Sequence, residues 1–105
     1  MATTATVPVL ITPEAQARVD ELGMQGELTA MLEHTRQTVR GLVSIDVERY
    51  DDPEGADEPR VVVTAWRYDP DWINDSTRAQ WRDWFVRTFS GDVRWNFGFS
   101  VRIKP

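Results

Sequence analysis

Acidic side chains are concentrated in one segment of the chain, where they could hold a cation or meet a basic partner. Seven carboxylates and one arginine lie between residues 46 and 59. Calcium takes about six to eight oxygen ligands on a shaped loop. An EF-hand loop needs acidic or amide ligands at alternating positions, then a glycine and a late glutamate. The acidic run at residues 69–75 fails at the fifth position and has no following glycine, and acidic loops are usually solvated, so we predict no metal site. The candidate binding residues here are Asp51, Asp52, Glu54, Asp57 and Glu58.

Basic side chains dominate the C-terminal part of the chain. From Ser76 onward there are six basic and two acidic residues. Arg94 and Arg102 are candidate binding residues, and Lys104 lies beside them in sequence. Nucleic-acid binding depends on neutralising phosphates with cations, whereas the net charge here is −5. The aromatic residues of this segment are also out of phase with its arginines, so nucleic acid is the weaker alternative.

The sequence contains no arrangement typical of an active site. His34 is the only histidine and cysteine is absent, so an imidazole pair, a thiolate nucleophile and a cysteine metal site are excluded. No serine has a nucleophile-elbow setting, and no glycine-rich phosphate loop is present. His34 falls away from the apolar stripe of its helix, where we expect it to be solvated. We predict no catalytic residue and no cofactor.

Five tryptophans stand out in a chain of this length. Trp81 and Trp84 share an apolar helical stripe, and Trp95 is in phase with an alternating apolar segment. Trp66 lies in a segment with apolar residues on both faces, which predicts an interior strand covered on both sides. We therefore assign these four to the core. Trp72 follows no periodic pattern, and it either covers the edge of the core or anchors a binding partner.

The elements that must position these residues follow from hydrophobic periodicity. Thr12 followed by Pro13 marks the start of a helix, and Gly23 marks its end. A second helix is predicted over residues 25–40, although one bent helix is the alternative. A third helix runs from a cap at residues 74–76 to a stop at residues 90–92. The alternating segments 43–48, 60–68 and 93–103 are predicted strands.

This order, α-α-β-β-α-β, predicts an α+β fold with a small three-stranded mixed sheet and helices packed on it. We expect the first two strands to be antiparallel, and the last to lie parallel to the second through a right-handed crossover. The first two helices either cover the opposite face from the third or extend its layer. Residues 1–11 form a partly ordered N-terminal arm, and residues 12–105 form a single domain.

The chain has 105 residues, of which 41% are hydrophobic and 28% charged. It has no apolar run near the about 20 residues of a membrane span and no basic leader, so we expect a cytoplasmic protein. The segregated charge and the long final strand favour a non-enzymatic protein-interaction module, either a homo-oligomer or the acidic partner or inhibitor of another protein. Two alternatives remain. One is weak RNA or DNA binding, and the other is an enzyme or ligand-binding protein whose pocket would use Asp46, Glu48, Tyr50 and Arg67.

Overall fold

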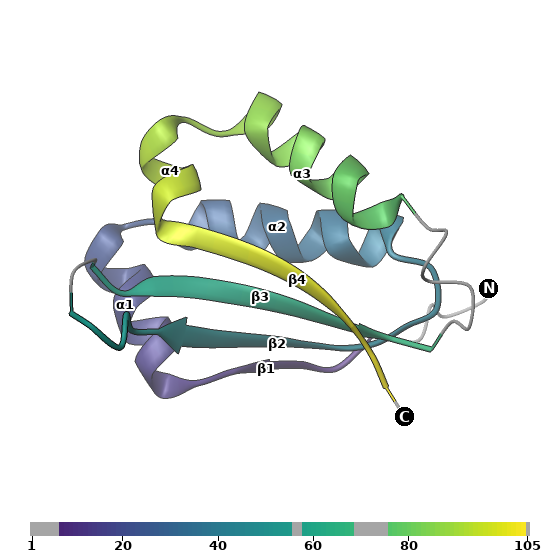
Figure 1. The fold of residues 1–105 in the computed structure, drawn as a ribbon, viewed down its shortest axis with the longest axis horizontal. Coiled ribbons are helices and arrows are strands. Elements are labelled where there is room, and N and C mark those ends of the chain that lie inside the picture. The colour runs from purple at the N-terminus through teal and green to yellow at the C-terminus, as the bar shows by residue number, and fades with distance from the viewer. Residues whose placement is uncertain (1–6, 56–57, 69–75, 105) are drawn as a thin grey trace.

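The structure is a computed structural model, and it describes residues 7–55, 58–68 and 76–104. Within these ranges the α+β class is confirmed (Figure 1). The elements are β1 (Val9–Ile11), α1 (Pro13–Leu22), α2 (Gln25–Thr38), β2 (Leu42–Tyr50), β3 (Arg60–Arg67), α3 (Thr77–Thr88), α4 (Gly91–Asn96) and β4 (Phe97–Ile103).

The described strands form one four-stranded sheet in the order β1-β2-β3-β4. As predicted, β2 and β3 are antiparallel, and β3 and β4 are parallel. The predicted count of three strands is wrong because part of the expected N-terminal arm pairs in parallel with β2. The Thr12 amide donates to the Val47 carbonyl at 3.0 Å, and the Ile45 amide donates to the Pro8 carbonyl at 2.9 Å. This pairing satisfies backbone groups that the outer edge of β2 would otherwise expose.

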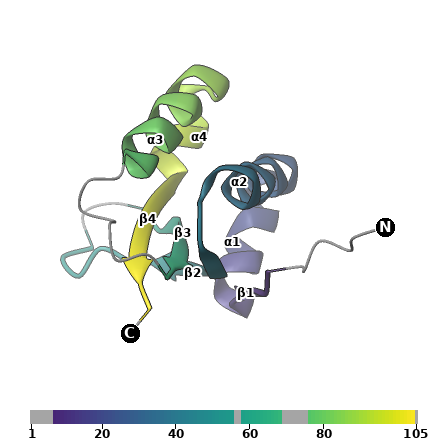
Figure 2. The same ribbon diagram turned by 90° about the vertical axis from the view of Figure 1, so that its right-hand side faces the viewer.

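The described helices all lie on one face of the sheet, as Figures 1 and 2 show together. The buried strand side chains alternate along each strand, which is the pattern of a sheet covered on a single face. The helical pair therefore extends the layer of α3. No described element covers the opposite face of the sheet, which we call the open face. The core cluster consists of Ala15, Val19, Leu28, Met31, Leu32, Ile45, Val47, Val61, Val63, Trp81, Phe85, Val93 and Phe97.

The boundary between the first two helices is confirmed. The Thr12 hydroxyl accepts a hydrogen bond from the Ala15 amide at 3.1 Å, and Pro13 occupies the first turn of α1. Gly23 ends this helix with a φ of 67°, in the left-handed region that favours glycine. The chain therefore forms two helices at this point and not one bent helix.

Residues 91–96 form α4, whereas the sequence predicted a helix stop at residues 90–92 and a strand from residue 93 onward. Val93 and Phe97 are 6% and 1% exposed. They lie four positions apart, which is close to one helical turn and is also an even number of strand positions. A helix and a strand would therefore both bury Val93 and Phe97. Only the exposure of Trp95 distinguishes a helix from a strand here. Trp95 is 61% exposed on α4, so its assignment to the core is wrong.

Trp66 lies on the open face of the sheet and not in the core. Its strand is interior, as predicted, but helices cover only one of its faces. The Trp66 indole Nε1 donates to Asp46 Oδ2 at 2.9 Å. The cationic groups of Arg102 and Lys104 lie 6.0 Å and 5.3 Å from the ring centroid. These polar and cation–π contacts let a large aromatic side chain remain half-exposed.

Arg18 ties α1 to the end of the β2–β3 connection and to α4. It is buried, its Nε donates to the Pro59 carbonyl at 3.2 Å, and its guanidinium pairs with Glu21 and Glu58. The guanidinium also contacts the Asn96 side chain. One side chain therefore holds three segments together.

Arg18→Ala should lower the free energy of unfolding by about 2 kcal/mol, because it removes a buried side chain together with its hydrogen bonds to the Pro59 carbonyl and the Asn96 side chain. Urea denaturation measures the change. Arg36→Ala is the matched control, since Arg36 is an exposed helical arginine with one ion pair to Glu33. Equal losses in the two variants would contradict the bridging role.

Candidate functional site

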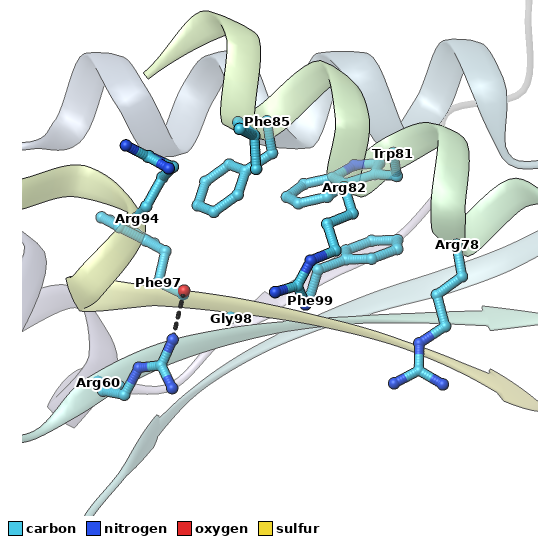
Figure 3. Close-up of a pocket in the computed structure, with 10 residues that line it drawn as sticks. Arg60, Arg78, Trp81, Arg82, Phe85, Arg94, Phe97, Gly98 and Phe99 are labelled. Carbon is cyan, nitrogen blue, oxygen red and sulfur yellow. Dashed lines mark hydrogen bonds between the residues drawn. The ribbon is translucent and has the colours of Figure 1, made fainter. Parts of the chain in front are cut away.

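A pocket of about 210 Å³ lies between α3 and the N-terminal half of β4 (Figure 3). We call it the arginine pocket. Its aromatic wall consists of Trp81 and Phe85 from α3 and of Phe97 and Phe99 from β4. The other lining residues are Arg60, Arg78, Arg82, Val86, Arg94 and Gly98.

The aromatic wall is fixed by packing and by a hydrogen bond. Trp81 stacks on Phe99 with ring centroids 4.0 Å apart and an interplanar angle of 5°. Phe85 packs on the same indole with a centroid distance of 5.1 Å. The Trp81 Nε1 donates to Thr35 Oγ1 at 3.0 Å, and that hydroxyl donates to the Met31 carbonyl at 2.7 Å. The indole can neither rotate nor slide without losing a buried hydrogen bond.

The arginines reach the pocket from three different elements. Arg78 and Arg82 are one turn apart on α3 and extend toward β4, while Arg94 comes from α4 (Figure 3). Arg60 starts on β3, and its Nη2 donates to the Phe97 carbonyl at 2.9 Å. Gly98 lies beside this side chain, and a Cβ there would make an ordinary van der Waals contact with the Arg60 Nη2 at 3.9 Å.

The pocket is locally cationic although the protein carries a net charge of −5. Among the described residues, no carboxylate lines it, and none of its arginines forms an ion pair. Elsewhere arginines are neutralised, as in the pairs of Arg49 with Asp51 and Arg87 with Asp83. Like charges held together without counterions favour an anionic ligand.

The predicted acidic residues lie in the connection between β2 and β3 and do not line this pocket. Asp51 pairs with Arg49 at 3.0 Å, and Asp52 accepts from the Glu54 amide at 3.1 Å. Glu58 pairs with Arg18 at 3.4 Å. Asp57 and Trp72 fall outside the described residues. The described part of the acidic connection thus pairs with Arg49 and Arg18 and supplies no lining residue of the pocket.

The two predicted arginines are separated by the sheet. Arg94 lines the arginine pocket, whereas Arg102 lies on the open face beside Trp66. Arg60, Arg78 and Arg82 were not among the binding residues predicted from the sequence. A signal for the last two was present, because their four-residue spacing places them on one helix face beside the aromatic stripe.

The residues proposed for an enzyme or ligand pocket do not converge. Asp46 and Glu48 are on the open face of the sheet, Tyr50 is exposed near its end, and Arg67 is buried on the helix-covered face. Within the described part of the chain, no group of three histidine or acidic residues could hold a metal ion. No helix in the same part is long and apolar enough to cross a membrane.

His34 is half-buried and stacked, whereas we expected it to be solvated. Its ring lies 3.8 Å from the Trp84 ring, centroid to centroid, with an interplanar angle of 5°. Trp84 itself is partly buried and packs against the core cluster. Burial lowers the pKa of His34 below its ordinary value of 6.5, because desolvation disfavours the imidazolium.

The His34 imidazole should therefore titrate below pH 6.5 in an NMR titration of the folded protein. Because the unfolded chain then binds the proton first, stability should fall as the pH decreases through the unfolded pKa. His34→Gln should remove this part of the pH dependence. A midpoint above 6.5 would contradict the expectation and show that attraction between imidazolium and indole outweighs desolvation.

No protein-family model, curated protein or solved structure matches this chain. The functional conclusion therefore depends on the geometry of the arginine pocket.

Proposed function

We propose that the protein is a non-enzymatic protein-interaction module that binds an acidic segment of another protein in the arginine pocket. The observation that carries this proposal is the set of lining arginines, which have no carboxylate partner among the described residues. A guanidinium matches the geometry of a carboxylate with two parallel hydrogen bonds. Several such groups around one opening favour an aspartate- or glutamate-rich ligand.

The accessible apolar side chains of the pocket support a protein ligand. Phe99 is half-buried and Val86 is 45% exposed, and apolar groups beside arginine are typical of the energetic centres of protein interfaces. The pocket volume of about 210 Å³ holds only a few side chains. A short segment that combines carboxylates with apolar side chains fits both parts of this surface.

A nucleic acid fits the pocket less well. Base recognition on single strands uses exposed aromatic faces as stacking platforms. Trp81 is only 2% exposed and already stacks on Phe99 and Phe85, so its faces are not available to a base. A long polyanion would also approach the acidic connection at the same end of the sheet.

A second copy of the chain also fits poorly. In a two-fold dimer through β4, antiparallel pairing would place the arginine pocket of one copy beside Arg102 and Lys104 of the other. Like charges would then face each other at both ends of the interface. The acidic connection of a second copy is also a poor ligand for the arginine pocket, because Asp51 and Glu58 already pair with Arg49 and Arg18.

A peptide titration tests the proposal. The probe is a short peptide of alternating valine and threonine with glutamates at both ends, which we call the glutamate peptide. The glutamine peptide replaces each glutamate by glutamine. By isothermal calorimetry at low salt, the glutamate peptide should bind at least about tenfold more tightly, and added salt should weaken it.

Equal affinities of the two peptides would contradict the proposal. A single-stranded oligonucleotide provides the third arm of the titration. Tighter binding of the oligonucleotide than of the glutamate peptide would favour the nucleic-acid alternative instead.

A further inference from the structure

We infer that the partner binds as an additional strand along the outer edge of β4, with its acidic residues beside the basic groups at the two ends of that strand. This inference rests on the proposed function and specifies the partner: an extended segment with apolar side chains at alternate positions. The observations that carry it are the free edge of β4, the direction of its backbone groups, its half-covered apolar side chains and the charges at its ends.

The two outer strands of the described sheet differ as docking edges. β1 is three residues long and follows Pro8, which has no backbone donor. β4 is seven residues long, and no described strand pairs with its outer side. Long unprotected edges are the places where a further chain adds to a sheet.

Backbone groups on β4 point outward at every second residue. The Lys104 amide donates to the Arg67 carbonyl at 2.9 Å, so the residues in phase with Lys104, namely Ser100 and Arg102, also direct their backbone groups toward β3. Successive residues of a strand direct these groups to opposite sides. The N–H and C=O groups of Phe99, Val101 and Ile103 therefore face the free edge.

The same residues carry apolar side chains that the helices cover incompletely. Phe99, Val101 and Ile103 are half-buried, whereas Val63 and Ala65, their neighbours on β3, are 0% exposed. An added strand with apolar residues at alternate positions would cover the exposed part of this row. Burial of these side chains would increase the affinity beyond what the main-chain hydrogen bonds provide.

Basic groups flank the free edge at both ends. The arginine pocket lies beside Phe97 and Phe99, and Arg102 and Lys104 lie at the other end of β4. A segment with carboxylates on either side of its apolar centre matches this distribution in either chain direction.

Backbone methylation of the glutamate peptide tests strand addition. Two peptides are compared, each N-methylated at every second residue and offset from the other by one position. In one peptide the methyl groups replace the N–H donors that face β4, and in the other they face solvent. One methylated peptide should lose at least about tenfold in affinity, because several backbone hydrogen bonds are removed together. The peptide methylated in the other phase should bind within about threefold of the parent.

The possible outcomes separate the two proposals. Equal affinities of the two methylated peptides, with the glutamate peptide still preferred over the glutamine peptide, would overturn strand addition and leave the pocket proposal standing. A glutamate peptide that does not bind at all would overturn both.

Amide hydrogen exchange of the protein gives a second readout. In the saturated complex, exchange at Phe99, Val101 and Ile103 should slow. Exchange at Ser100 and Arg102 should change little, because their amides already face β3. Val101→Pro removes one outward N–H at an edge where proline is tolerated, so a folded V101P protein should bind the glutamate peptide more weakly. Unchanged exchange at all five amides on saturation would overturn the inference.

Discussion

Replacing Trp81 by alanine should lower the free energy of unfolding by about 3–5 kcal/mol. The side chain is 2% exposed and contacts Trp84, Phe85 and Phe99. Its indole is also the donor to Thr35. The substitution would open a cavity between α3, α2 and β4 and leave a buried hydroxyl without its donor. Domains of this size are stable by only about 5–15 kcal/mol, so the loss would be a large fraction of the total.

Trp95→Ala is the matched control for this experiment. Trp95 is 61% exposed on α4, and an exposed substitution should change stability by no more than about 0.5 kcal/mol. Urea denaturation followed by circular dichroism measures both variants. A large loss for Trp95→Ala would contradict the helical course of residues 91–96 and favour the strand predicted from the sequence.

Removing two charges from the arginine pocket should nearly abolish partner binding. In the double variant Arg82→Gln and Arg94→Gln, affinity for the glutamate peptide should fall about 100-fold, since a charge-assisted hydrogen bond contributes roughly a factor of ten. Neither arginine is buried or ion-paired with a described residue, so the fold should remain intact. Calorimetry measures the affinity, and circular dichroism checks the fold.

A second double variant separates the site from the overall charge. Arg36→Gln with Arg87→Gln removes the same number of charges from exposed arginines that pair with Glu33 and Asp83. Its affinity for the glutamate peptide should stay within about threefold of the parent, because screened charges outside the site contribute little. Equal losses in the two double variants would show that net charge, and not the pocket, governs binding.

Local signals allowed much of the fold to be predicted from the sequence. The cap at Thr12 and the left-handed Gly23 act within a few residues, so the limits of α1 were predictable. The alternation of residues along β2, β3 and β4 correctly predicted strands, because each of these strands buries one face. Their relative directions followed from the lengths of the connections between them.

The remaining features depend on contacts between distant segments. The short apolar run at residues 9–11 becomes a strand only because the edge of β2 is available to it. Trp66 looked like a core residue because its exposed face is stabilised by Asp46 and Arg102, which pairing brings beside it. The arginine pocket itself needs β3 next to β4, with Arg60 crossing under Gly98, and no local pattern encodes that arrangement.

Chemical-shift mapping with the glutamate peptide tests the central claim most directly, because the two sheet faces carry separate reporters. Gly98 and the Trp81 indole belong to the arginine pocket, and the Trp66 indole lies on the open face. We predict that saturating peptide shifts the Gly98 amide and the Trp81 indole signals more than the Trp66 indole signal, which can respond only through Arg102 and Lys104 beside its ring. A shift confined to Trp66, or no shift at any of the three, would contradict the assignment of the binding site.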